Sequence, residues 1–312
     1  MKKITLSMGC FVALAFQLSA QTIGSSWAPS PWRGNEIHYT ENVSGVDAGS
    51  AGSGQTWNYA SLSDDSVNVE SIVPPAGQNS ADMFPAASLA SVIVDGDGVT
   101  LSSYFQTSAS AYTVLGASVT DGSATGTFVY SNPFDLFRFP IGFGQSYSDD
   151  FESSVTALGF TYQRNGTVQV DVDGSGSLAT PFGAFPEVLR VKSVETYQLI
   201  GLPPIPGVST SGVVTTYNYI SAANPGLLLM TYIIDDDNIG NVDTTIAFSN
   251  PNYVGIERVN EESFSMYPVP ASSEVRISAG TPISNIELFD MNGRSSAVIA
   301  ANGSTQAVIG VC

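Results

Sequence analysis

Residues 21–312 of this chain offer few groups that could perform catalysis. Its one histidine is His38, so any Ser-His-Asp triad has to use it, and no Gly-x-Ser-x-Gly nucleophile motif accompanies it. One histidine and the terminal Cys312 cannot supply a tetrahedral zinc site. We therefore predict no catalytic residue, no cofactor-binding residue and no metal ligand, and interpret His38 as structural.

Carboxylates are abundant, with 28 Asp and Glu residues. A glycosidase needs only two of them, so this requirement is too easily met to identify one. Trp27, Trp32 and Trp57 lie close together in the sequence and could form a platform for sugar stacking. Because large aromatic side chains dominate core burial, we expect them to anchor the core instead. A polysaccharide-active hydrolase stays open as an alternative.

Acidic turns raise the question of calcium. Residues 171–176 and 95–98 contain Asp-x-Asp-Gly-like runs, and Asp235–Asp237 are three adjacent carboxylates. None completes an EF-hand loop, which requires a Glu at its twelfth position. Asp-Gly is also a common hairpin turn, so we predict turns at the first two places. For Asp235–Asp237 a bridging cation stays open, because adjacent carboxylates repel one another.

The elements that would position these groups are strands. Val168, Val170 and Val172 alternate with polar residues, as do the apolar positions of 213–219, whereas residues 227–234 are apolar throughout and predict a central strand. Residues 81–90 are the one helix expected, limited by Pro85.

Short Gly-containing turn motifs separate the apolar runs. They are Asp95-Gly96, Asp121-Gly122, Asn165-Gly166, Asp173-Gly174 and Asn224-Pro225-Gly226. Pro181 and Gly183 predict a further tight reversal, after which Arg190 and Lys192 should point outward. The sequence thus predicts an all-β fold, with an antiparallel β-sandwich or a curved half-barrel as the main domain.

The N-terminus has the pattern of a signal peptide. Lys2 and Lys3 precede an apolar run from residue 4 to 18, and cleavage is expected between Ala20 and Gln21. The run is too short for a permanent membrane span, so no transmembrane segment is expected in the mature chain. The mature chain keeps only Cys312, which excludes an internal disulfide. It has 28 acidic residues against eight basic ones, or −20, which argues against nucleic acid or an anionic membrane as a partner.

Two short motifs near the C-terminus share the spacing of a known export module. The first is a Tyr-Pro-x-Pro turn and the second an Asp-x-x-Gly-Arg turn, carried by Tyr267, Pro268, Pro270, Asp290, Gly293 and Arg294. The segment 264–294 resembles the type A C-terminal sorting domain of proteins that Bacteroidetes export through the type IX secretion system. The resemblance implies that these six residues form the sorting signal and that the secretion machinery is a partner.

The same resemblance implies a location and a division of the chain. The protein is expected to cross the periplasm and to be secreted or held at the outer-membrane surface. Residues 1–20 would be the signal peptide, 21–258 an all-β domain, and 259–312 a small β-sandwich-like sorting module. Residues 295–312 stop before the family's Leu-x-x-Gly-x-Tyr segment and last strand, so we expect a truncated module with an unpaired edge.

The main domain has elements similar to those of uncharacterised Bacteroidetes secreted proteins, such as residues 139–147 and 176–192. This resemblance implies no activity. We expect a non-catalytic binding protein whose ligand is a carbohydrate, a surface protein or a hydrophobic molecule. The alternatives are the hydrolase and a lipid-binding half-barrel, which would show an apolar concavity of several hundred Å³.

Overall fold

The structure is a computed structural model with two compact units that divide between residues 255 and 256, and each is described by itself. The structure describes residues 21–31, 33–41, 43, 46–157, 159–202, 209–224, 228–236, 242–251, 264–267, 273–289 and 295–310.

The first unit is built from strands, which confirms the all-β prediction. Its strands are β1 (Thr22–Ile23), β2 (Arg33–Glu41), β3 (Gly52–Asn58), β4 (Ser66–Val73), β5 (Leu89–Val94), β6 (Thr100–Thr107), β7 (Ala111–Thr120), β8 (Thr125–Arg138), β9 (Ile141–Gly142), β10 (Ser146–Ala157), β11 (Phe160–Thr180), β12 (Gly183–Ile200), β13 (Ser211–Ile220), β14 (Leu228–Asp236) and β15 (Val242–Asn250). The helices of the described residues are two short 3-10 turns, η1 (Ser25–Trp27) and η2 (Ala81–Met83). The helix expected over 81–90 is therefore only η2, because β5 begins at Leu89.

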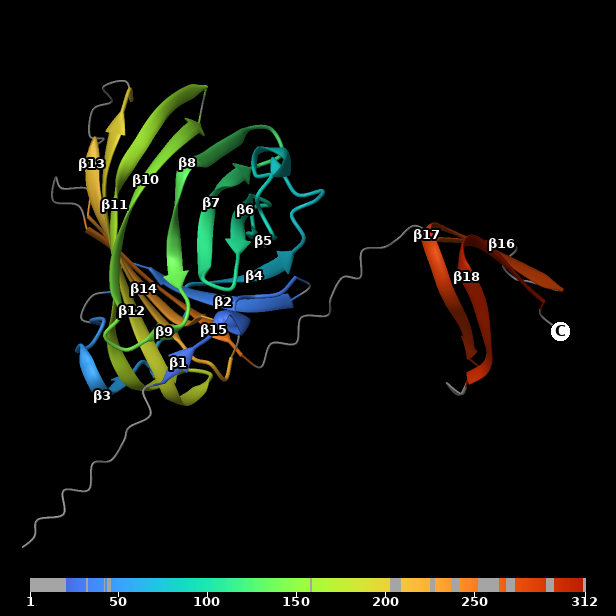
Figure 1. Cartoon of the computed structure of the whole chain (residues 1–312), viewed down its shortest axis with the longest axis horizontal. Helices are drawn as coiled ribbons and strands as arrows, with labels where there is room; N and C mark the ends of the chain where they lie inside the picture. The colour runs from blue at the N-terminus through green and yellow to red at the C-terminus, as the bar shows by residue number, and fades with distance from the viewer. Residues whose placement is uncertain are drawn as a thin grey trace, which may run out of the picture. The chain divides into compact units, whose positions relative to one another are not determined.

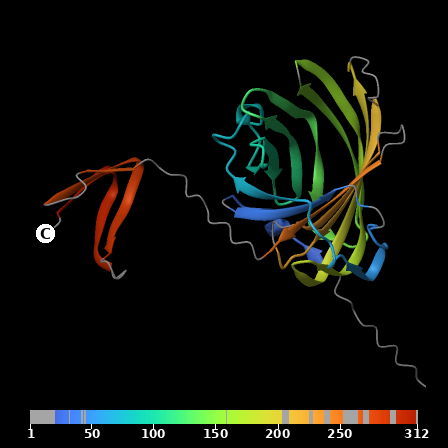
Figure 2. The same ribbon diagram turned by 180° about the vertical axis from the view of Figure 1, so that it is seen from behind.

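The large sheet closes on itself. Its order is β10-β8-β7-β6-β5-β4-β2-β15-β14-β13-β12-β11-β3, and β10 also pairs with β11, so every strand except β3 belongs to one antiparallel ring (Figures 1 and 2). The expected curvature is present, and it goes beyond a half-barrel because the two edges meet. Strand β3 lies outside the ring and pairs in parallel with the C-terminal half of β11. The strand expected over 227–234 is β14, which lies between β13 and β15.

Strand alternation gives the ring an apolar interior. Val168, Val170 and Val172 of β11 are almost fully buried and belong to one core cluster. At one end Trp27 of η1 joins the same cluster and packs edge-on against Phe137, with ring centroids 5.1 Å apart. This end of the ring is therefore filled by side chains.

Two of the turns predicted from Gly-containing pairs are strand positions instead. Asn165-Gly166 and Asp173-Gly174 both lie inside β11, and the second is at a register shift against β12. A Cβ on Gly166 would collide with the backbone of Thr196 and the ring of Phe151, so this glycine is needed for close cross-strand packing. Gly183 does adopt the positive φ expected for the β11–β12 reversal, at 144°.

Arg190 points away from the ring interior, as predicted, yet it is only 2% exposed, which corrects the expectation of a solvent-facing side chain. It forms a bidentate pair with Asp173, Nε to Oδ1 at 2.8 Å and Nη2 to Oδ2 at 2.9 Å. Its Nη1 donates to the carbonyls of Ala48 and Gly49, both at 2.6 Å. Arg190 thus fastens the segment before β3 to the outer face of the sheet.

The second unit is a three-stranded antiparallel sheet of order β16-β17-β18, with bounds β16 (Phe264–Tyr267), β17 (Glu274–Phe289) and β18 (Ser295–Gly310). Val275 lies opposite Ile309, which is 3% exposed. In the sheet as described, β18 is an edge strand.

We predict that Arg190→Met strongly destabilises the first unit, because it leaves the Asp173 carboxylate and two carbonyls without their buried partner. Breaking a buried ion pair costs about 3–5 kcal/mol, and about 2–4 °C of Tm per kcal/mol then gives a decrease of about 6 °C or more. The control is Lys192→Met, which removes a positive charge from the same face of β12 and should change Tm by about 2 °C or less. Differential scanning calorimetry checks both, and equal Tm values for the two variants would contradict this role of Arg190.

Candidate ligand pocket

An open, mostly apolar pocket lies at the end of the ring opposite Trp27. Its volume is about 430 Å³, and it is lined by the ends of β7, β8 and β10 together with Val99 before β6. We call it the rim pocket and define it by its apolar inward-facing residues Ala117, Val119, Phe128 and Val155. These residues offer a hydrophobic surface and no nucleophile.

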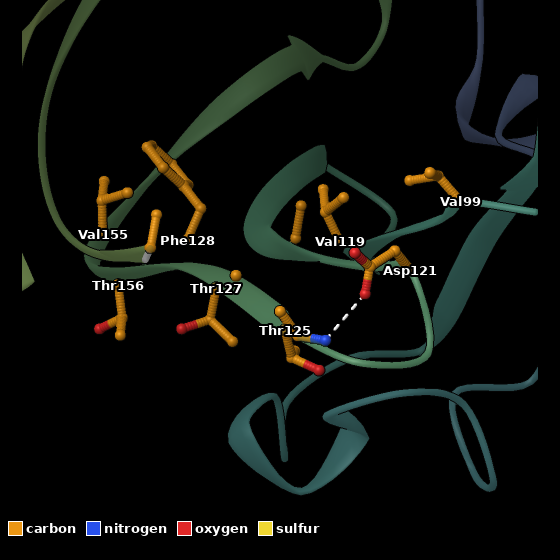
Figure 3. A pocket seen from close by; sticks show the side chains of 12 residues that line it. Val99, Val119, Asp121, Thr125, Thr127, Phe128, Val155 and Thr156 are labelled. Atoms are coloured by element: carbon orange, nitrogen blue, oxygen red, sulfur yellow. Dashed lines mark hydrogen bonds between the residues drawn. The ribbon is translucent and has the colours of Figure 1, made fainter. Parts of the chain in front are cut away.

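Strand register brings these four residues together. Phe128 of β8 lies directly opposite Ala117 on one side and Val155 on the other. Their chain neighbours Thr127 and Thr156 point to the opposite face, as Figure 3 shows. Side chains of directly paired residues share a face, so these strands place one apolar row across the inside of the ring.

Asp121 is the carboxylate among the lining residues, and its own turn holds it. Its Oδ1 accepts from the backbone N–H of Ala124 at 2.8 Å (Figure 3). It also accepts from the N–H and the hydroxyl of Ser123, each at 2.8 Å. The hydrogen bond from Ala124, followed by those from Ser123, lowers the pKa of Asp121 to about 2. This carboxylate is ionised at neutral pH and shapes the β7–β8 turn.

Below the rim pocket, towards Trp27, the next inward layer contains a charged pair. Arg164 of β11 forms an ion pair with Glu195 of β12, and their side chains are 15% and 17% exposed. The guanidinium carbon lies 4.0 Å from the ring centroid of Tyr197 and 5.7 Å from that of Phe128. Burial also raises the pKa of the nearby Tyr130, so its hydroxyl stays protonated.

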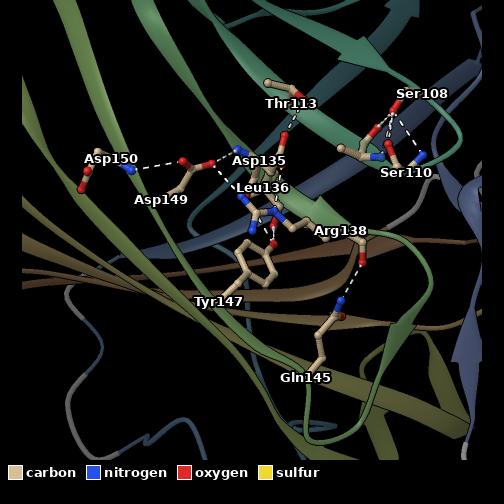
Figure 4. Close-up of polar contacts among 11 residues, drawn as sticks. Ser108, Ser110, Thr113, Asp135, Leu136, Arg138, Gln145, Tyr147, Asp149 and Asp150 are labelled. Carbon is tan, nitrogen blue, oxygen red and sulfur yellow. Dashed lines mark hydrogen bonds and ion pairs between the residues drawn. The ribbon is translucent and has the colours of Figure 1, made fainter.

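A second cluster joins β8 and β10 where their backbone pairing stops, after Asn132 on β8 and before Glu152 on β10. Arg138 donates from Nε to Asp135 at 2.9 Å and from Nη2 to Asp149 at 3.1 Å, and its guanidinium lies 4.4 Å from the Tyr147 ring centroid (Figure 4). The bond to Asp135 raises the pKa of Arg138. These carboxylates share one cation and close the gap between the strands, so they are a structural pair.

His38 lies between two carboxylates on the outside of the ring. Its Nε2 is 2.9 Å from Glu36 and its Nδ1 3.0 Å from Asp64, and its ring stacks on Phe248 at 5.4 Å between centroids. The pKa of Glu36 is lowered by its hydrogen bond from Asn250 and then by His38, and that of Asp64 is lowered by His38. In a triad one ring nitrogen faces the nucleophile. The geometry therefore supports the structural interpretation.

Where the structure describes the acidic segments, groups of the protein itself hydrogen-bond to their carboxylates. Asp95 accepts from the backbone N–H groups of Asp97 and Val99, both at 2.9 Å. Among the described residues no group of three or more His, Cys, Asp or Glu could hold a metal ion. The side chains of Asp235–Asp237 lie outside the described residues.

The tryptophans were predicted to anchor the core. Trp27 is 4% exposed and Trp57 3%, which confirms the prediction for both. Trp32 lies outside the part of the chain that the structure describes.

The export residues are described only in part. Gln21 donates from Nε2 to the carbonyl of Glu187 at 3.0 Å, and Tyr267 is 75% exposed at the end of β16. The remaining predicted residues lie outside the described ranges: Ala20, Pro268, Pro270, Asp290, Gly293 and Arg294. The cleavage site and the sorting signal stay predictions.

Comparisons with known proteins identify no relative. No family model, no curated protein and no solved structure matches this chain. In the described ranges, no helix has the length and apolar character needed to span a membrane.

Sequence reasoning missed both the rim pocket and Arg164. The sequence did contain the information needed to place Arg164. Arg164 is an even number of residues away from Val168, Val170 and Val172, so it shares their inward face if the strand extends that far. The assumption of a turn at Asn165-Gly166 hid it.

We predict that the Asp121 carboxyl titrates with a midpoint near pH 2, because the turn donates three hydrogen bonds to its ionised form. Because the folded-state pKa lies below the unfolded value of about 3.9, the ionised carboxylate stabilises the folded protein at pH values above about 3.9. This stabilisation is lost as pH falls through about 2. Carboxyl-carbon NMR checks the midpoint. A midpoint for Asp121 near 3.9, the usual value for an Asp carboxyl, would contradict the geometry.

Proposed function

We propose that this protein is an exported, non-catalytic binding protein that takes an apolar ligand into the rim pocket. The observation that supports it best is the pocket, whose volume of about 430 Å³ falls within the range of roughly 300–1,000 Å³ typical of small-molecule sites. Its inward-facing residues are apolar, so the favourable term is the removal of apolar ligand surface from water.

A polysaccharide hydrolase has less support. It would need two carboxyl groups roughly 5–10 Å apart on either side of a cleft. The rim pocket contributes only Asp121, whose Oδ1 is held by its own turn. Asp135 and Asp149 do lie close together, but both are engaged by Arg138 between β8 and β10.

The export route is part of the proposal. The signal-peptide pattern of residues 1–20 and the sorting motifs between Tyr267 and Arg294 support secretion through the type IX system, with the protein released or held at the outer-membrane surface. An extracellular binding protein with 28 acidic residues against eight basic ones, or −20, would also stay soluble there.

We predict that Val119→Arg weakens binding of the neutral fluorescent probe N-phenyl-1-naphthylamine, because a guanidinium would be placed in the apolar pocket. The matched control is Val69→Arg on β4, since Val119 is 43% exposed and Val69 42% exposed, and Val69 does not line the pocket. Fluorescence titration should show at least a tenfold weaker Kd for Val119→Arg and an unchanged Kd for Val69→Arg. Equal loss in both variants, or no binding by the unmodified protein, would contradict the proposal.

We also predict that residues 259–312, fused to a fluorescent cargo in a host with the type IX system, direct export less efficiently than a full-length sorting module. The physical reason is that β18 is an edge strand of the sheet as described, so this fragment presents an unpaired edge. The secreted fraction of fluorescence measures this, and export equal to that of the full-length module would show that the unpaired edge does not limit export.

A further inference from the structure

The rim pocket and the Arg164–Glu195 pair are successive layers of the same inner face. Val155 lies opposite Phe128, and Ser153, two residues along β10, lies opposite Arg164. Two residues along a strand span roughly 7 Å. The Phe128 ring belongs to both layers, because it lines the pocket and lies 5.7 Å from the guanidinium. The lining of the rim pocket includes Phe128 but neither member of the ion pair, so a ligand has to extend past Phe128 to reach the pair.

The pair offers hydrogen bonds without net charge. Arg164 carries five N–H donors and Glu195 carries acceptor oxygens, so together they can serve a group that both accepts and donates. A hydroxyl or an amide does this and brings no charge of its own. Such a head group would offer the ion pair hydrogen bonds in place of the water that the ligand displaces, and it would leave the pair intact. Separating Arg164 from Glu195 would cost free energy, because each charge would then be buried without its partner.

Charged head groups fit less well. An ionised carboxylate would compete with Glu195 for Arg164 and would add negative charge to a chain whose net charge is −18. Glu70 also faces the interior, where it accepts from Asn35 at 2.8 Å and from Ser91 at 2.5 Å. A ligand cation would need an aromatic face, but the guanidinium of Arg164 already covers the Tyr197 ring at 4.0 Å.

We infer that the ligand is a neutral single-chain amphiphile. Its hydrocarbon chain lies against Val119, Phe128 and Val155, and its hydroxyl- or carbonyl-bearing head hydrogen-bonds to Arg164 and Glu195. This inference rests on the proposed function and adds the class of head group.

The test is displacement of N-phenyl-1-naphthylamine from the full chain by three amphiphiles of one chain length. They are 1-monododecanoylglycerol (neutral), dodecanoate (anionic) and dodecyltrimethylammonium (cationic), compared at about pH 8, where the carboxylate is ionised. The neutral compound should displace the probe at a concentration at least tenfold lower than either ion.

A charge-switch variant tests the head-group contact. Glu195→Gln keeps the shape but leaves Arg164 without its anion, so dodecanoate should gain at least tenfold in affinity over the unmodified protein. Glu152→Gln, an exposed carboxylate on the outer face of β10, is the control and should leave all three affinities unchanged. Circular dichroism checks that Glu195→Gln is folded, and if it is not, the ligand series on the unmodified protein decides alone.

The outcomes separate the two proposals. If dodecanoate or the cation binds as tightly as the neutral compound, the head-group inference fails and the proposed function stands. The same holds if the probe binds but none of the three displaces it. If neither the probe nor any amphiphile binds, the proposed function itself fails.

Discussion

Strand β10 forms hydrogen bonds with β8 on one side and β11 on the other, and this double pairing turns a long sheet into a closed ring. Closure removes the exposed edges that would otherwise pair with other chains. It also fixes, for every strand, which alternate residues face inward. Where the β8–β10 pairing ends, side chains have to complete the wall, and Arg138 does so by binding Asp135 and Asp149 together. The inner face and its pocket exist only because the ring is closed.

Three of the few basic residues of this acidic chain lie where closure of the ring or burial of a carboxylate needs a cation. Arg138 joins two strands, Arg190 fastens the segment before β3 to the outer face, and Arg164 compensates Glu195 inside the ring. A buried charge is tolerated when it is paired and hydrogen-bonded. The interior is therefore apolar at the rim, neutral but polar one layer below, and filled by Trp27 and its neighbours at the other end. This gradient along one axis suits a molecule with an apolar body and a polar, uncharged end.

Local patterns in the sequence predicted the strands, but they could not predict how the strands pair to close the ring. Val168, Val170 and Val172 identified an inward face because alternation is a local property. Asn165-Gly166 and Asp173-Gly174 were wrongly predicted as turns because their glycines are needed for packing between strands. Gly166 lies under Phe151, and Gly174 lies under Trp57, which is far away in the sequence. The pocket depends on the register among β7, β8 and β10, which is set by tertiary pairing. Arg164 lay on a predictable face, but its partners Glu195 and Tyr197 come from another strand.

The central claim is that the closed sheet binds its ligand on the inner face at the rim. Methyl NMR of the full chain with bound 1-monododecanoylglycerol tests it most directly, through intermolecular nuclear Overhauser effects. We predict effects from the hydrocarbon chain to the methyl groups of Val119 and Val155 and none to those of Val69, which faces outward on β4. Effects at Val69 with none at Val119 and Val155 would contradict the account.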